Sequence, residues 1–288
     1  MAEIQPASYL DVVGVRLHYE RSGEPRADRP TLVLVHGFGA SHQSWHDVFP
    51  ILAKYHTTVR VDLKGFGFSD KPDDHNYRPD DQAALLAEFI QKLPDQRVIL
   101  VGHSYGGGVA LKAYFSLKNS GREPVQVVGL VLADAAVFAQ DFPFFVSYLR
   151  NPWTSFIIES FSTPEWRTQY VLKRIFVDQN SVTTARIHRY AYFLRLNGAE
   201  RALRRGAEQI DLSDSEEITR RLDTIKVPVL LIWGENDPVI SVEHGRTLVS
   251  RLPQAELHIL PKTGHVPHEE RPEQTVQILD VFLKRFEK

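Results

Sequence analysis

A serine set between glycines is the part of the sequence best suited to chemistry. Residues 102–106 read GHSYG and follow the apolar run Val98–Val101. They match the pattern G-x-S-x-G, in which a serine stands on a sharp turn between a strand and a helix. Glycine suits such a turn because no side chain fits beside the serine, whose hydroxyl projects at a helix N-terminus that favours developing negative charge. We therefore predict that Ser104 is a nucleophile; the alternative is a glycine-rich helix start that packs closely on a strand.

A serine hydroxyl is a weak nucleophile at neutral pH, so it needs a general base that an acid orients. The predicted base is His265, which follows a glycine in the loop between the last expected strand and the last expected helix. Freedom from helix and strand packing suits a side chain that carries protons. His268, in the same loop, is the competing candidate.

The predicted acid is Asp237, in the segment LIWGENDPVI directly after a buried apolar run. Catalytic groups gather at the carboxyl ends of the strands in an open parallel sheet, which is where this residue would lie. A turn-forming role before Pro238 would explain the same aspartate. Asp134, at the end of the preceding expected strand, is the alternative acid.

Short apolar runs rich in β-branched residues recur along the chain and would position these groups. Such runs are typical of strands that are buried on both faces of a parallel sheet. Two further strands, at residues 10–13 and 15–20, form an expected hairpin that turns at Gly14. The buried runs are Thr31–Val35, Thr58–Asp62, Arg97–Val101, Val127–Ala133 and Val227–Trp233, with one more strand at Glu256–Leu260.

Amphipathic helices are expected between the strands, because apolar residues recur at helical spacing at Asp81–Leu93 and Pro272–Phe286. Alternating strands and helices predict an α/β fold, with a mostly parallel central sheet flanked by helices.

The alternation stops at residues 137–214, a helix-compatible segment that holds 14 of the chain's 30 aromatic residues. It is predicted to be a helical subdomain that packs these side chains in a core of its own, lines a substrate pocket with them, or does both. The candidates for lining the pocket are Phe138, Phe142, Phe145 and Trp153.

The order Ser104, Asp237, His265 along the chain is the order of the triad in the α/β-hydrolase fold. On these residues the chain resembles serine-nucleophile, esterase-like members of the α/β-hydrolase superfamily over essentially its full length. The resemblance implies a hydrolase core at residues 1–136 and 215–288 and an inserted helical cap, or lid, at residues 137–214.

Two further motifs resemble this superfamily. Residues 36–39 read HGFG and directly follow an expected strand. In similar proteins such a loop donates a backbone N–H, so the resemblance implies an oxyanion hole formed by the N–H groups of Phe38 and Tyr105. Residues 62–72, DLKGFGFSDKP, match a D-x-x-G-x-G-x-S loop that we interpret as structural, with neither Asp62 nor Ser69 catalytic.

The two histidines beside these motifs are not expected to carry protons. His36 is interpreted as an orienting hydrogen-bonding group, and His103, inside the G-x-S-x-G turn, has no place in the proton relay.

These residues predict a serine hydrolase of the EC 3.1.1 class, similar to carboxylesterases and lipases. It would cleave carboxylic esters with an apolar acyl or alcohol group through an acyl-enzyme intermediate. Related haloalkane dehalogenases and epoxide hydrolases carry aspartate at the elbow, where this chain has Ser104, so those activities are disfavoured.

Three alternatives stay open. A C–C bond hydrolase of ring-cleavage diketones would use the same triad and a basic cap residue that holds a substrate carboxylate; Arg150, Arg174 and Arg189 are unranked candidates. Thioesterases and perhydrolases share the same constellation of residues. A non-catalytic small-molecule receptor on this fold is the hypothesis from a different class.

The composition excludes several other functions. The net charge of the 288 residues is −2, which gives no reason to expect nucleic acid or an anionic membrane as a partner. The absence of cysteine excludes a thiol nucleophile, a thiolate zinc site and an iron–sulfur cluster. No apolar run is long enough to span a membrane, and no signal peptide is visible at the start, so a cytoplasmic location is expected.

No cofactor or metal is expected. The paired glycines near residues 37 and 65 lack the rest of a dinucleotide fingerprint or a P-loop. Neither of the imaginable ligand sets has a diagnostic spacing; these sets are His42, His46 and His56, and His265, His268 and Glu269. The sequence leaves the physiological substrate and the oligomeric state open.

Overall fold

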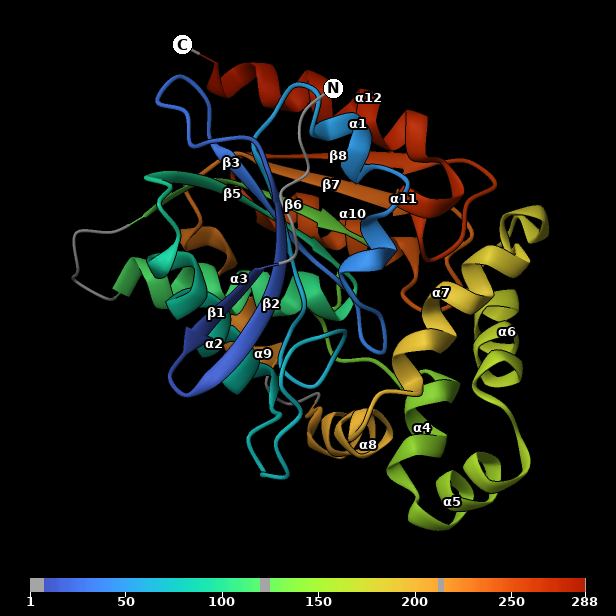
Figure 1. Ribbon diagram of the computed structural model, residues 1–288. Coiled ribbons are helices and arrows are strands. Elements are labelled where there is room, and N and C mark those ends of the chain that lie inside the picture. Colours follow the sequence, from blue (N-terminus) through green and yellow to red (C-terminus); the bar gives the residue numbers. More distant parts are fainter. Residues whose placement is uncertain (1–7, 120–124, 212–214, 288) are drawn as a thin grey trace.

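A computed structural model describes residues 8–119, 125–211 and 215–287 (Figure 1). Two expectations concern residues outside these ranges: the absence of a signal peptide at the start of the chain, and the end of the cap at residue 214.

The centre of the molecule is an eight-stranded sheet in the order β1-β2-β4-β3-β5-β6-β7-β8. Strand β2 runs antiparallel to its neighbours β1 and β4, and all other neighbouring strands are parallel. The hairpin and the buried strands predicted from sequence are confirmed, with ends that differ by a few residues. The strands are β1 Ser8–Val12, β2 Val15–Ser22, β3 Thr31–Val35, β4 Thr58–Val61, β5 Arg97–His103, β6 Gln126–Ala133, β7 Val229–Gly234 and β8 Ala255–Leu260.

Helices cover both faces of the sheet because alternate residues of each central strand point to opposite sides. In β3, Val33 and Val35 join the core beneath helices α2, α3, α9 and α10. Leu32 and Leu34 join the core beneath α1 and α12. These helices are α1 Phe49–Leu52, α2 Pro79–Lys92, α3 Tyr105–Asn119, α9 Ser215–Arg221, α10 Val242–Arg251 and α12 Pro272–Leu283. The predicted α/β fold is confirmed.

Within the described residues, helices α4 to α8, which follow β6, correspond to the predicted cap, and Figure 1 shows them grouped on one side of the molecule. They are α4 Phe144–Arg150, α5 Pro152–Phe161, α6 Pro164–Ile175, α7 Thr184–Leu194 and α8 Ala199–Gln209. Side-chain oxygens of Asn151, Thr163 and Thr183 accept the first free N–H groups of α5, α6 and α7, and so begin these helices. Two small apolar clusters pack the cap helices together, and each also contains a side chain from outside the cap, Val266 in one and Phe38 in the other.

The remaining short elements are η1 His42–Trp45, η2 Gln179–Ser181, η4 Leu222–Thr224, α11 Pro267–Glu270 and η5 Lys284–Phe286. Among the helices of the described ranges, none combines the length and apolar composition needed to cross a membrane.

Candidate active site

The turn between β5 and α3 holds Ser104 in a left-handed conformation, with φ at 52°. A non-glycine residue in this region costs about 1–2 kcal/mol, so the surrounding structure must stabilise it. The Ser104 N–H donates to the Ala133 carbonyl at 2.9 Å. A Cβ atom at Gly102 would lie 2.6 Å from the Gly106 carbonyl oxygen, and one at Gly106 would lie 2.3 Å from that of His36. The glycines of the G-x-S-x-G pattern are therefore needed for close packing of main chain on main chain.

Three side chains from separate loops form a continuous hydrogen-bonded chain. Nε2 of His265 lies 2.9 Å from Ser104 Oγ, and Nδ1 of the same ring lies 2.8 Å from Asp237 Oδ2. Since a carboxylate only accepts, Nδ1 carries the ring proton and Nε2 is free to accept from the serine hydroxyl. The other carboxylate oxygen of Asp237 accepts from the N–H groups of Val239 and Ile240, at 2.7 and 3.0 Å, which fixes its orientation.

Asp134, the alternative acid, lies beside Asp237 but plays a different part. A carboxylate oxygen of Asp134, a carboxylate oxygen of Asp237 and a ring nitrogen of His265 all lie within 4.8 Å of one another. Oδ1 of Asp134 accepts from the N–H of Gly234 at 2.9 Å, and its buried Oδ2 has no donor among the described residues. Burial and the charge of Asp237 raise the pKa of Asp134 well above its usual value, which favours the protonated carboxyl beside Asp237.

The pKa of Asp237 itself is lowered. Burial alone would raise it, but the electrostatic attraction and hydrogen bond of His265, together with the hydrogen bond of Asp134, outweigh that effect. The opposite directions of these two pKa shifts favour a negative charge on Asp237, the carboxylate that contacts His265.

The two histidines near the serine, His103 and His268, are not part of the hydrogen-bonded chain from Ser104 to Asp237. Nε2 of His103 donates to the carbonyl oxygen of His265 at 2.7 Å, and burial followed by the charge of His265 lowers the pKa of His103 to about 3. His268 is buried and stacks on Trp45 with ring centroids 4.2 Å apart. Burial lowers the pKa of His268 well below its usual value. Both rings are therefore neutral packing groups.

The HGFG loop after β3 lies directly against the serine. A Cβ atom at Gly37 would lie 2.9 Å from Nδ1 of His103 and 3.3 Å from Cβ of Ser104. The N–H groups of Phe38 and Tyr105 form no hydrogen bond with the residues that the structure describes, so they are available to a ligand. His36 Nε2 accepts from the N–H of Leu63 at 3.0 Å and its Nδ1 contacts the Gly37 carbonyl at 2.8 Å, which agrees with an orienting role.

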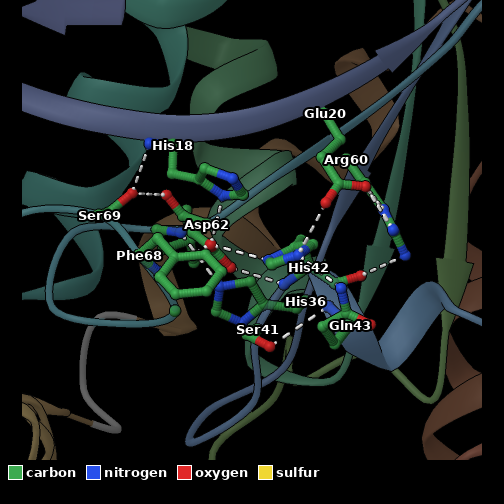
Figure 2. A network of polar contacts seen from close by, with 12 residues as sticks. His18, Glu20, His36, Ser41, His42, Gln43, Arg60, Asp62, Phe68 and Ser69 are labelled. Atoms are coloured by element: carbon green, nitrogen blue, oxygen red, sulfur yellow. Dashed lines mark hydrogen bonds and ion pairs between the residues drawn. The ribbon is translucent and has the colours of Figure 1, made fainter. Parts of the chain in front are cut away.

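Asp62 forms the centre of a buried polar network behind this loop (Figure 2). Its Oδ2 lies 2.7 Å from Nδ1 of His18 and 2.8 Å from Nδ1 of His42, and accepts from the N–H of Phe68 at 3.0 Å. Ser69 donates to the Asp62 carbonyl at 2.6 Å. Asp62 and Ser69 therefore tie β2, β4 and the following loop together, as the structural interpretation predicts.

Two clusters of histidine and aspartate side chains could in principle hold a metal ion, so the spacing of their nitrogen and oxygen atoms can be compared with that of the ligands of zinc. The two imidazole nitrogens on Asp62 are at hydrogen-bond distance from its oxygen, closer than the roughly 3.3 Å that separates ligands around tetrahedral zinc. In the other clustered set, Asp134, Asp237 and His265, the histidine nitrogen is likewise at hydrogen-bond distance from Asp237, at 2.8 Å. Within the described ranges, His42, His46 and His56 do not come together as a ligand set.

Two cavities meet at Ser104, and both are also lined by Phe38 and Phe145. The first, which we call the core-side chamber, extends between α3 and the segment after β6; its other walls include Val109, Phe138 and Phe142. The second, the cap-side chamber, extends beneath α4, α6 and α7 and also contains His265; its other walls include Leu149 and Leu172. Of the four aromatic residues expected to line the pocket, Phe138, Phe142 and Phe145 line one or both of these cavities.

Trp153 is the exception. It stands in the first turn of α5, is 78% exposed and lines neither chamber, so the expectation for this residue is corrected. The Asn151 side chain that begins α5 accepts the Trp153 N–H, and the helix then carries this indole on the outer surface of the cap.

The expected cap arginines also lie outside the two chambers. Arg150 donates to the carbonyls of Ala207 and Ile210, Arg174 stacks on Tyr170, and Arg189 lies 3.7 Å from Asp47. Two residues that sequence reasoning missed line the cap-side chamber instead: Arg167 of α6 and Tyr148 of α4. Nothing in the local sequence distinguishes Arg167 from the other cap arginines, because the signal is a cavity formed by separate helices.

The fold and the site can be compared with known proteins. A sequence model of the alpha/beta hydrolase family matches residues 32–278. The chain belongs to the α/β hydrolase family. This α/β hydrolase is 28% identical to an uncharacterized hydrolase, YugF, of Bacillus subtilis over 284 residues, which cover 99% of this chain and all of that one. It is 26% identical to a soluble epoxide hydrolase of Corynebacterium sp. over 95% of this chain and 94% of that one.

A solved structure of an α/β hydrolase fold protein from Burkholderia ambifaria is also similar. The TM-score is 0.81 at 25% identity, with 97% of this chain and all of that chain covered. Together these findings show a hydrolase of this fold and leave the bond that it cleaves to be argued from the site.

Proposed function

We propose that this α/β hydrolase cleaves carboxylic esters by serine catalysis. The observation that carries the proposal is the unbroken chain from Ser104 Oγ through the His265 ring to the Asp237 carboxylate. An aspartate at the elbow would attack an epoxide or a halogenated carbon directly, whereas this chain offers a hydroxyl together with a base that can deprotonate it.

The geometry supports a two-step reaction. Ser104 Oγ attacks the ester carbonyl carbon while His265 Nε2 takes the hydroxyl proton, and Asp237 stabilises the imidazolium that forms. The N–H groups of Phe38 and Tyr105 stabilise the tetrahedral oxyanion, a contribution of roughly 3 kcal/mol for each well-placed donor. The imidazolium then protonates the leaving alcohol, and an acyl-enzyme remains.

Hydrolysis of the acyl-enzyme repeats the cycle with water. His265 takes a proton from a water molecule that attacks the acyl carbonyl, and returns it to Ser104 Oγ as the acid leaves. The neutral carboxyl of Asp134 does not take part in either step.

The two chambers support the choice of substrate. Because both open at Ser104, one is placed to take the acyl group and the other the alcohol group of an ester. Apolar side chains such as Val109, Phe138 and Leu172 dominate the walls, which favours apolar groups on both sides of the ester bond. The cap, proposed to span residues 137–214, would exclude water from this bond.

Turnover of a graded series of p-nitrophenyl esters tests the proposal. We expect hydrolysis by the wild-type protein and a loss of about 10³-fold or more in kcat for Ser104→Ala. Ser116→Ala, on the exposed side of α3, is the matched control and should leave kcat unchanged. Equal rates for the wild-type protein and Ser104→Ala would overturn the proposal, and turnover of a ring-cleavage diketone in preference to every ester would replace it with C–C hydrolysis.

A further inference from the structure

The cap-side chamber has one polar corner within its apolar walls. Arg167 of α6 and Tyr148 of α4 both line this chamber, which also contains Ser104 and His265. A charged side chain beside an apolar cavity is costly unless its hydrogen bonds are satisfied, so its presence there needs a reason.

The guanidinium of Arg167 is only partly satisfied. The side chain is 7% exposed, and Nη2 donates to Oε1 of Glu200 on α8. Nη1 is buried and has no acceptor among the residues that the structure describes. A buried donor without an acceptor destabilises the protein, and an acceptor supplied by a ligand in the chamber would remove that cost.

The Tyr148 side chain offers a second donor near the first. Its hydroxyl forms no hydrogen bond with any of the described residues, and its side chain lines the same chamber as Arg167. Burial raises the pKa of Tyr148, so the hydroxyl stays protonated and can donate. The corner therefore has two unused donors.

The charge of the corner decides which acceptor it suits. Glu200 already balances the positive charge of Arg167 in the ion pair that the two side chains form. An uncharged oxygen could accept from both donors without upsetting this balance. A carboxylate would bring a second negative charge next to Glu200, which is unfavourable where water is scarce.

We propose that the substrates of this hydrolase carry an uncharged oxygen acceptor, such as a keto, ether or second carbonyl oxygen, on the part that occupies the cap-side chamber. Arg167 and Tyr148 bind that oxygen, and Glu200 selects against a carboxylate at the same place. The inference rests on the proposed ester hydrolysis, and it adds a specificity site at a distance from the reacting carbonyl.

Matched sets of three esters test the inference. One set consists of ethyl pentanoate, ethyl levulinate and monoethyl glutarate, whose acyl chains have equal length and end in a hydrocarbon, an oxo-bearing and a carboxylate tail. Longer sets vary the distance between the ester carbonyl and the tail. Sets with the same three tails on the alcohol side test the case in which the alcohol group, and not the acyl group, occupies the cap-side chamber. Acid release is followed by pH-stat titration.

For the wild-type protein we expect kcat/KM for the oxo ester to exceed that for the hydrocarbon ester by about tenfold or more at the length that reaches the corner, with the carboxylate ester poorest. Arg167→Met and Tyr148→Phe should each remove most of this preference while the hydrocarbon ester is still hydrolysed. Glu200→Gln should raise kcat/KM for the carboxylate ester at least several-fold. Arg195→Met removes a cap arginine that pairs with Glu165 on the surface, and it should change none of these ratios.

The outcomes separate the two proposals. Equal kcat/KM for the oxo and hydrocarbon esters at every length, or a wild-type preference for the carboxylate, would overturn the inference and leave ester hydrolysis standing. No turnover of any ester by the folded wild-type protein would remove the proposed function itself. If Arg167→Met does not fold, as judged by circular dichroism, the near-isosteric Tyr148→Phe and Glu200→Gln variants still decide the question.

Discussion

The main-chain N–H of His265 donates a hydrogen bond to the carbonyl oxygen of Ile175, 2.9 Å away. His265 lies in the loop between β8 and α11, whereas Ile175 is the last residue of α6 in the cap. The proposed general base is therefore fastened to the cap through its own backbone. A shift of this part of the cap would move the imidazole relative to Ser104.

Glu270 strengthens the same connection, and its removal should slow catalysis. Its carboxylate accepts from Gly264 at 2.7 Å and from Val177 and Asp178 of the cap at 2.9 Å each. For Glu270→Ala we expect kcat for ester hydrolysis to fall about tenfold with a smaller change in KM, because the His265 loop loses its support while the chambers remain. Steady-state kinetics measure this effect. Glu273→Ala, on the exposed start of α12, should be neutral; an equal loss in both variants would contradict a positioning role.

The two aspartates near His265 should respond differently to the same substitution. Asp237→Asn should lower kcat by about 10³–10⁴-fold, because asparagine no longer holds the imidazole in the productive tautomer. Asp134→Asn should cost less than about tenfold, because an amide N–H can replace the carboxyl proton that is donated to Asp237. Rates on a p-nitrophenyl ester decide between the two. If only Asp134→Asn abolishes activity, the assignment of Asp237 is wrong.

The buried pair of His42 and Asp62 should make stability depend on pH. Burial alone would lower the pKa of His42, but the charge and hydrogen bond of Asp62 raise it above 6.5. A group whose pKa is raised on folding stabilises the protein fully below its unfolded pKa, and this contribution disappears as pH rises through the folded pKa. His42→Gln should therefore cost more stability at pH 6 than at pH 9.

Urea denaturation of the wild-type and His42→Gln proteins at a series of pH values gives this difference directly. Other buried histidines with lowered pKa values, such as His103, also make stability depend on pH. Their contributions cancel in the difference because both proteins contain them. A difference in the free energy of unfolding that stays constant from pH 6 to pH 9 would show that His42 is neutral in the folded protein.

The main-chain packing of the elbow should make Gly106 intolerant of any side chain. A Cβ atom there would lie 2.3 Å from the His36 carbonyl oxygen, so Gly106→Ala should lower the free energy of unfolding by about 3 kcal/mol or more. Gly14→Ala is the control, because that residue has a φ of 78° but no atom within 4 Å of the added carbon. Its cost should be only about 1 kcal/mol, from backbone strain. If thermal or urea denaturation shows similar losses in the free energy of unfolding for Gly106→Ala and Gly14→Ala, the packing argument is contradicted.

Much of the fold could be predicted from the sequence because the relevant signals are local. The continuous apolar run at Thr31–Val35 predicted a doubly buried strand, and β3 has those bounds. The glycines around Ser104 predicted the sharp turn that its φ of 52° shows. The aspartate and glycines of residues 62–72 predicted a structural loop, and the carboxylate of Asp62 accepts main-chain and histidine hydrogen bonds there.

The residue types available for catalysis, and the order in which the chain presents them, can be read directly from the sequence. The packing of the folded chain was needed to see which of two aspartates contacts His265, and that the pKa of the other, Asp134, is raised. It also decided that Arg167 faces a chamber while Trp153 is exposed. The physical reason is that residue spacing reports which face of one element is buried. Contacts among loops from separate strands, and cavities between separate helices, depend on how all those elements pack together.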